Sequence, residues 1–485
     1  MGTNVQVVPL IIVVVYLCGM LLIGFLVNKL QIKNSTDYMI AGRRMGLFMV
    51  ACSLSANNVG GGSTTGLAAR AFSSWGMSAA WYVLAAAIAM IPLSYFAPKI
   101  RKTMAITIPE VLSRRYGDLS GTLTAILNIG SLFCLTSSQV MASGSVISSL
   151  TGIPLNVCIL VAGIVVIAYT TMGGLIADTI TDVIQYIVIM IGLAVAVPAV
   201  LNGIGGWQVV AAKLPPVELD FFKVGWVTIL GLIFNYFCTF LSGPEMVSRF
   251  ESAKDEKTAQ RASWLSAVLM ASIAFLPTII GLAALAVNPD LDGGKGTTAL
   301  MTTTAQYAPP FITGLLSAAI IAATMSSADS NLLCASSMFV RDIYMKYINK
   351  DIPDNKIIFV TRISNVVICL CSMCISFLNI SLVTMNLFAF ALRSAGPFAA
   401  YALGLACPGA TRHAGISSII VGSVAAVTWQ ILGEPFGILA IVFGCTLGTL
   451  AFLITWGVEK SMGAPPAPSA YPTAEEIALL ESEVN

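Results

Sequence analysis

The sequence has very little charge for its length. Only 10% of its 485 residues are charged, 25 of them basic and 23 acidic, and the mean hydropathy is +0.88. A soluble domain carries about 25% charged residues, so this composition excludes a soluble protein and indicates an integral protein of the lipid bilayer. The formal net charge of +2 provides no strongly basic surface, and we expect no nucleic-acid partner.

Groups that bind transition metals are scarce or scattered. The chain has one histidine, His413, and eleven cysteines without the spacing of a disulfide-rich secreted domain. Cys369, Cys371 and Cys374 form the tightest group, but they lie within an apolar run far along the chain from His413. We therefore interpret the cysteines as small hydrophobic residues and expect no structural metal site.

Motifs of common catalytic machinery are also missing. The segment Gly60-Gly61-Gly62-Ser63-Thr64 has no following lysine, so it is not a phosphate-binding P-loop. The membrane-embedded serines have no histidine near them in the sequence, which excludes a serine hydrolase of the usual kind. Repeated pore loops, which are typical of channels, are not apparent either. We expect that the protein is not an enzyme.

Thirteen apolar runs are long enough to cross a bilayer. They lie at roughly 6–28, 45–72, 76–98, 120–149, 153–171, 175–203, 223–247, 263–287, 311–340, 357–379, 382–406, 414–432 and 435–457. The first run lacks the basic start and cleavage site of a signal peptide, so we interpret it as a retained span.

Basic residues predict the orientation of these spans. They gather after the first, third, seventh and ninth runs, as at Lys29, Lys102, Arg249 and Lys346. The positive-inside rule then places the N-terminus outside and the C-terminus in the cytoplasm of a multi-pass protein of the cell membrane. This arrangement requires an odd number of spans, which thirteen satisfies.

The pattern of runs predicts five parts of the chain. Residues 1–44 hold the first span and a cytoplasmic loop, 45–204 and 205–410 are two five-span units, 411–458 hold two further spans, and 459–485 form a cytoplasmic tail. Hydropathy allows the two units to be an inverted repeat, although no internal sequence identity supports one.

The run from Met45 to Phe72 has a centre that is unsuited to a continuous helix. Three glycines and several small polar residues follow Asn57 and Asn58, a very poor helix-forming composition. Within hydrocarbon, freed backbone groups must be satisfied by a cavity, an ion or a ligand. We predict a helix broken at mid-membrane, as transporters use at their binding sites; the alternative is a packing face of small residues.

A second stretch, Ala322 to Asn331, is rich in oxygen atoms. On a helix the Ser327 hydroxyl lies beside the carbonyl of Ala323, and Ser326 adds a second hydroxyl. Carbonyls freed at Ala56 and Val59 complete an uncharged five-oxygen site, which suits a monovalent cation better than Ca²⁺ or Mg²⁺. The alternative is that these serines bond only to their own helix.

Four stretches resemble the sodium:solute symporter family, which includes the proline, sodium–glucose and sialic acid symporters. They are Thr36–Arg43, Ser53–Ala68, Gly173–Gln185 and Ser326–Tyr344. The resemblance implies an all-α membrane protein with the leucine-transporter-like inverted repeat of five plus five helices, one extra N-terminal helix and two extra C-terminal helices. It also implies that sodium ion is the only metal, bound by Ala56, Val59, Ala323, Ser326 and Ser327.

Three aspartates lie within predicted spans, where carboxylates are costly and usually functional. By the same resemblance, Asp182 matches a position that in some members helps to bind a second sodium with serines of the later helix. The matching positions here are Ser326, Asp329 and Ser330, so an aspartate replaces one serine. A second cation at Asp182, Asp329 and Ser330, a bound proton and a helix cap all stay open.

Five residues are candidates for binding the transported solute: Asn58, Ser63, Gln139, Tyr236 and Arg393. Four of them both donate and accept hydrogen bonds, although each is also a plausible packing residue. Arg393 is suited to clamp a carboxylate with two parallel hydrogen bonds, and its alternative is an ion pair with a buried aspartate.

The sequence therefore predicts sodium-coupled symport of a small polar solute into the cell by alternating access. A zwitterion or carboxylate such as an amino acid is favoured because Arg393 is available. The alternatives are a proton-coupled transporter of the same fold and sodium-coupled uptake of a quaternary amine, sugar or vitamin. The expected partners are the solute, sodium ion and the lipid bilayer, and we expect the protein to function as a monomer.

Overall fold

The computed structural model describes residues 6–31, 34–378 and 380–473, and these residues are helical apart from connecting segments and one isolated bridge between Met45 and Ala253. Short 3₁₀ and π segments join the α-helices. The α-helices are α1 (Val7–Gln31), α2 (Ser35–Ile40), α3 (Leu47–Asn58), α4 (Thr65–Arg70), α5 (Trp81–Lys102), α6 (Ile108–Tyr116), α7 (Asp118–Thr151), α8 (Leu155–Ile204), α9 (Trp207–Lys213), α10 (Gly225–Ser242), α11 (Pro244–Ser252), α12 (Glu256–Ile273), α13 (Phe275–Val287), α14 (Ala299–Tyr307), α15 (Pro310–Met338), α16 (Asp354–Ser376), α17 (Leu382–Ser394), α18 (Pro397–Ala406), α19 (Arg412–Ile431) and α20 (Ala440–Ser461).

Ten helical segments of the described residues are long and apolar enough to cross a membrane, or eleven if the bent pair α17–α18 is one span. The apolar segment Leu155–Thr171 and helix α3 are too short to be counted by length, whereas α4 is counted as the beginning of the segment Thr65–Lys102. The number thirteen therefore stays a prediction. Helix α8 passes through two of the predicted runs and bends between them at Gly174, where φ is +56°. Tyr38 leaves no room there for a Cβ atom.

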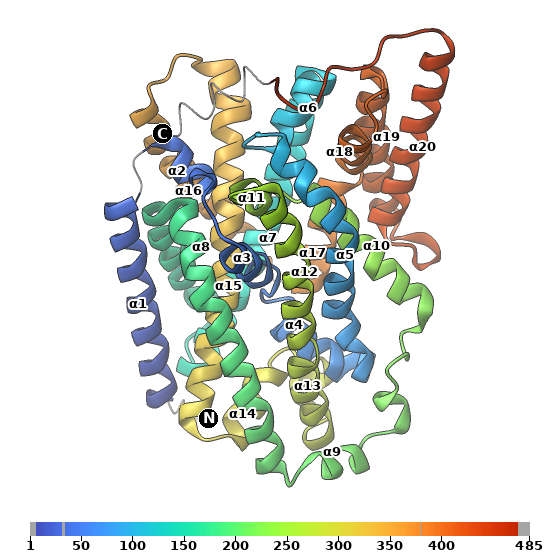
Figure 1. Ribbon diagram of the computed structural model, residues 1–485. Helices are drawn as coiled ribbons and strands as arrows, with labels where there is room; N and C mark the ends of the chain where they lie inside the picture. Colours follow the sequence, from blue (N-terminus) through green and yellow to red (C-terminus); the bar gives the residue numbers. More distant parts are fainter. Residues whose placement is uncertain (1–5, 32–33, 379, 474–485) are drawn as a thin grey trace.

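Helix α15 lies at the centre of the bundle and packs against α1, α7 and α8 (Figure 1). Every residue from Leu316 to Met338 is buried. Alanine, serine and threonine fill much of this segment, and such small side chains allow neighbouring membrane helices to approach closely. The oxygen-rich stretch predicted from the sequence is therefore enclosed by other helices.

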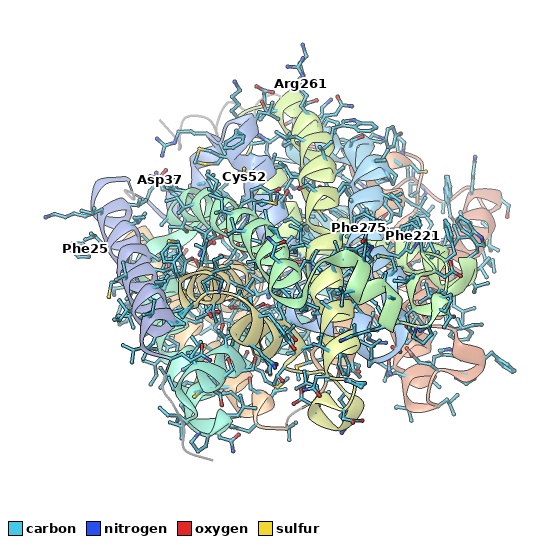
Figure 2. All side chains as sticks on the ribbon, turned by 90° about the horizontal axis from the view of Figure 1, so that it is seen from below. Phe25, Asp37, Cys52, Phe221, Arg261 and Phe275 are labelled. Carbon is cyan, nitrogen blue, oxygen red and sulfur yellow. The ribbon has the colours of Figure 1, made fainter. Side chains whose placement is uncertain are left out.

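The outer surface of the bundle is formed by exposed apolar side chains. Helix α1 exposes large hydrophobic side chains along its outer face, including Ile11, Val15 and Leu22. Figure 2 places Phe25 at the rim of the molecule, with 48% of its surface exposed, whereas Cys52 of α3 is fully buried. This outward-facing apolar surface is what a bilayer covers.

Two helices that line the centre are interrupted. The first break, between α3 and α4, falls on residues 59–64, as the glycine run predicts. The second lies between α10 and α11, where Gly243 adopts an extended conformation and Pro244 begins the next helix. The apolar run predicted over 223–247 therefore contains the end of α10 and the beginning of α11, because a proline has no amide hydrogen to continue the helical hydrogen bonds there.

The positions of helices α1 and α20 show at which face of the bundle the described chain begins and at which face its last long helix ends. In Figure 1, α1 begins at the lower face and α20 ends at the upper face, on the side of α2 and α6. The described chain therefore crosses the bundle an odd number of times. This agrees with an odd number of spans, although it does not say which face is cytoplasmic.

Candidate functional site

A buried pocket lies beside the first break and is lined from several parts of the chain. All five predicted solute-binding residues line it: Asn58, Ser63, Gln139, Tyr236 and Arg393. Its free volume is about 40 Å³, which is enough for about three water molecules. An organic solute would need the walls to move apart.

Further residues line the same pocket and were not predicted from the sequence. They include Asn57, Tyr82, Phe240, Glu245, Asn331, Asn386 and Phe390. Most are single polar or aromatic residues within apolar runs, where no local motif distinguishes a lining residue from a packing residue. Glu245 did have a signal, because the preceding Gly243-Pro244 pair marks a helix break at which side chains face a cavity.

Arg393 forms an ion pair within this pocket. Its Nη1 lies 2.6 Å from Oε2 of Glu245, and the two side chains are 1% and 6% exposed. The guanidinium carbon also lies 5.1 Å from the ring centroid of Phe390, while Nε has no hydrogen-bond partner within residues 6–31, 34–378 and 380–473. The sequence left open a carboxylate clamp or a pair with an aspartate; the observed partner is a glutamate of the second break.

The glycines of the first break allow polar side chains to reach the backbone. The amide nitrogen of Gly61 donates to Oε1 of Gln139 at 2.8 Å. A Cβ atom on Gly60 would lie 2.6 Å from that oxygen and 2.8 Å from the Ser327 hydroxyl, closer than real contacts allow. On Gly62 it would lie 2.7 Å from Nδ2 of Asn386. The break is therefore packed directly against pocket-lining amides.

Aromatic rings form one wall of the pocket around Tyr236. The ring centroid of Tyr236 lies 5.5 Å from that of Tyr82, 5.3 Å from that of Phe240 and 6.1 Å from that of Phe390. Edge-to-face and tilted rings at these separations attract one another. The wall gives an apolar surface to a solute whose polar groups face the break.

Ser327, one of the predicted sodium ligands, lies where α15 touches the first break. The Ser327 hydroxyl lies 2.7 Å from the carbonyl oxygen of Asn57 and 3.1 Å from that of Ala323. Within the described residues, no hydrogen bond between elements or in turns ends on the carbonyls of Ala56 or Val59. The Ser327 hydroxyl donates one hydrogen and keeps its lone pairs. Hydroxyl and carbonyl oxygens are thus available to a cation.

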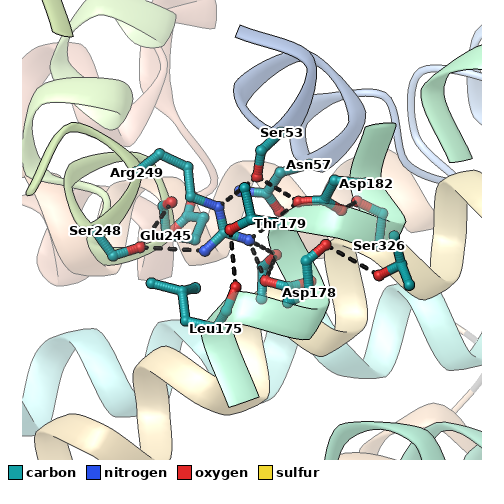
Figure 3. A network of polar contacts seen from close by, with 12 residues as sticks. Ser53, Asn57, Leu175, Asp178, Thr179, Asp182, Glu245, Ser248, Arg249 and Ser326 are labelled. Carbon is teal, nitrogen blue, oxygen red and sulfur yellow. Dashed lines mark hydrogen bonds and ion pairs between the residues drawn. The ribbon is translucent and has the colours of Figure 1, made fainter. Parts of the chain in front are cut away.

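Ser326 connects this region to a buried carboxylate. Its hydroxyl donates to Oδ1 of Asp182, and the Ser53 hydroxyl donates to Oδ2 of the same side chain (Figure 3). A hydroxyl that donates to a carboxylate still has lone pairs, which the negative charge makes better ligands for a cation.

The residues that were predicted to bind a second cation have different neighbours in the structure. Asp182 and Ser330 both contact Arg249, as does Asp178, whose Oδ2 also accepts from Ser330 at 3.1 Å. Asp329 is 3% exposed, and its Oδ1 has no partner among the described residues. The sequence placed Arg249 in a cytoplasmic loop after an apolar run. That placement was wrong, because the side chain of Arg249 is fully buried against both aspartates.

Comparisons with known proteins find relatives that match nearly the whole chain. A sodium/proline symporter of Staphylococcus aureus (strain USA300) is 28% identical over 495 residues, which cover 94% of this chain and 93% of the relative. The structure of a Na⁺-coupled sialic acid symporter, in a substrate-bound outward-open state, superposes with a TM-score of 0.78 at 22% identity over 95% of this chain and 98% of its own.

More distant structures share the fold alone. Mhp1, a nucleobase-cation-symport-1 family transporter with bromovinylhydantoin bound, gives a TM-score of 0.59 at 16% identity over 90% of this chain and 97% of its own. These neighbours place the chain among helical transporters of the leucine-transporter-like fold.

The model of the sodium:solute symporter family matches residues 38–422, a range that contains both breaks, the pocket and the buried aspartates. Its members and the structural neighbours are transporters and not enzymes. The chain therefore belongs to the sodium:solute symporter family, and it is a multi-pass membrane protein that couples the movement of a solute to sodium.

Proposed function

We propose that the protein takes up a small zwitterion, such as an amino acid, into the cell by alternating access. Sodium is held by the carbonyls of Ala56, Val59 and Ala323 and the hydroxyls of Ser326 and Ser327. The solute occupies the pocket beside the break, which is lined by Asn58, Arg393 and the sodium ligand Ser327. Because both sites share the segment between α3 and α4, filling one orders the backbone that forms the other.

The observation that carries the choice of solute is the buried pair of Arg393 and Glu245, which lines the pocket with both of its charges. A carboxylate alone would satisfy the guanidinium and leave the glutamate without a counter-charge, which is costly inside a protein. A zwitterion that enters between the two satisfies both, with its carboxylate on Arg393 and its ammonium on Glu245. The name of the S. aureus relative, a symporter of a zwitterionic amino acid, favours the same class.

The test is a matched set of ligands added to the purified protein in sodium or in potassium. An amino acid, its amine-free acid and its amide without a carboxylate differ by one charge each. We expect a rise in melting temperature with the amino acid in sodium only, and little change with the two analogues. Equal stabilisation by the acid and the amino acid would contradict a role for Glu245 in binding the ammonium.

A proton-coupled transporter remains the second candidate because buried carboxylates exceed their cationic partners. Asp178 and Asp329 each have a buried oxygen without a hydrogen-bond partner in the part of the chain that the structure describes. Uptake into proteoliposomes driven by a sodium gradient at equal pH, or by a pH gradient without sodium, separates the two mechanisms. Accumulation in the second condition alone would overturn the proposal.

A further inference from the structure

A guanidinium lies buried among oxygen atoms next to the proposed sodium site. Arg249 reaches from α11 toward α3, α8 and α15, and its side chain and those of Asp178 and Asp182 are 0% exposed (Figure 3). The guanidinium contacts its neighbours directly. The interior of the bundle therefore already contains a permanent cation, since a guanidinium does not lose its proton in proteins.

The groups around this guanidinium are those that a monovalent metal ion would take. Its Nη2 contacts the carboxylates of Asp178 and, at 3.4 Å, Asp182, and donates to the Ser330 hydroxyl. Its Nε lies 2.8 Å from the Ser53 hydroxyl and its Nη1 3.3 Å from that of Ser248. Two carboxylates and three hydroxyls from four helices form a set of hard oxygen ligands, and Arg249 occupies it.

The guanidinium and the sodium site share one carboxylate. Oδ1 of Asp182 accepts from Ser326, a proposed sodium ligand, whereas Oδ2 faces Arg249 and accepts from Ser53. A second sodium among these oxygens would lie at contact distance from a fixed positive charge, in a region that water does not screen. Arg249 already donates to Oδ2 of Asp182, the oxygen of that carboxylate that faces away from Ser326.

We infer that Arg249 is a resident cation that fills the second cation position, so that the protein binds one sodium per chain. Its removal would open a second sodium site between Asp182, Ser53 and Ser330. The inference rests on the proposed sodium site at Ser327 for the one ion that does bind. It also gives Arg249 a positioning role, because the guanidinium holds Asp182 where it orients the Ser326 hydroxyl.

The test counts sodium ions on the purified full-length protein by equilibrium binding of radioactive sodium. We expect one ion on the wild-type protein and one on Arg249→Lys, which keeps the positive charge. Arg249→Met has a similar length and no charge, and we expect two ions and a steeper sodium dependence, with a Hill coefficient rising from one toward two. The double variant Arg249→Met, Ser330→Ala should return toward one ion, because it removes a ligand of the second position and leaves Asp182 to orient Ser326.

The outcomes separate this inference from the proposed function. Two ions on the wild-type protein, or one ion on a folded Arg249→Met variant, overturn the inference and leave the Ser327 site in place. No ion on the wild-type protein overturns both. If Arg249→Met does not fold, the wild-type count is decided independently by the number of charges moved per solute in proteoliposomes, which should be one for a neutral zwitterion.

Discussion

Ser327 is the residue on which the sodium site depends most directly. We predict that Ser327→Ala lowers apparent sodium affinity by roughly ten- to a hundredfold, because a hydrogen bond or contact to a charged group contributes about 1.5–3 kcal/mol. Alanine is a better helix former than serine, so the melting temperature without sodium should barely change. Sodium titrations of solute uptake and of the melting temperature measure both effects.

A matched control for this variant lies on the same helix. Ser317 is also buried and donates to the carbonyl of Thr313 at 2.7 Å, but it lies away from the break. Ser317→Ala should leave sodium affinity unchanged. In Ser327→Ala, solute affinity should fall at low sodium and recover at saturating sodium, because linkage is reciprocal. A wild-type sodium dependence in Ser327→Ala would make Ser327 a packing residue.

Arg393 is the residue on which solute recognition depends. We predict that Arg393→Lys weakens solute binding by roughly tenfold or more, because lysine keeps the charge but loses the planar, bidentate geometry. Sodium affinity measured without solute should barely change. Isothermal titration with each ligand separately checks this, and Glu245→Gln serves as the partner variant. Equal losses of sodium and solute affinity would indicate that the pair of Arg393 and Glu245 has only a structural role.

At the scale of the element, the first break requires glycine for space as well as for flexibility. We predict that Gly60→Ala weakens sodium and solute binding together, by at least tenfold each, because its Cβ would press on both Gln139 and Ser327. Gly19→Ala on α1 is the control, since nothing lies within 4 Å of a Cβ there. Binding measured at equal melting temperature distinguishes this effect from misfolding. A Gly60→Ala variant that loses only one ligand would contradict a shared break.

The two breaks also show which elements the sequence can predict. Residues 60–62 predict the first break, because three consecutive glycines in an apolar run disfavour a helix in any surroundings. The second break carries a weaker signal, one glycine and one proline, within a run that hydropathy alone extends to residue 247. Because hydropathy does not reveal this second break, the sequence places Arg249 in a loop after the run. The burial of Arg249 depends on how α11 packs against its neighbours, which include α3 and α15.

At the scale of the whole molecule, the pairs that form the site are distant in sequence. Arg393 and Glu245 are 148 positions apart, and Ser326 and Asp182 are 144 apart. No local pattern encodes such partners, since they depend on how the helices pack. Two of the family stretches, Ser53–Ala68 and Ser326–Tyr344, did identify residues that line the pocket, because polar groups in a membrane segment face a cavity rather than lipid.

The inferred stoichiometry of one sodium per solute would also limit how far the protein concentrates its solute. A potential of −100 mV contributes about 2.3 kcal/mol to the inward movement of one sodium, and a tenfold sodium gradient about 1.4 kcal/mol. Together they support an accumulation of a few hundredfold for a neutral zwitterion. A second sodium would roughly square this ratio, so the resident Arg249 would set the ceiling of the whole transporter.

The distribution of basic residues predicts how the whole chain is oriented in the membrane. The apolar segment Glu256–Val287 separates Lys254, which is exposed at one end, from Asp290, which is exposed at the other. In a cysteine-free background, we predict that Lys254→Cys and Tyr347→Cys are shielded from an impermeant maleimide added to whole cells, whereas Asp290→Cys is labelled. All three should react after the membrane is permeabilised.

The matched pair Lys254→Cys and Asp290→Cys makes this measurement decisive, because one membrane crossing lies between them. Labelling of Lys254→Cys and not of Asp290→Cys in intact cells would invert the orientation. The side chain of Tyr347 is 58% exposed, so a failure to react after permeabilisation would reflect folding and not topology. With the basic face inside, the membrane potential drives sodium from the face where α1 begins toward the face where α20 ends, and coupled transport is then uptake.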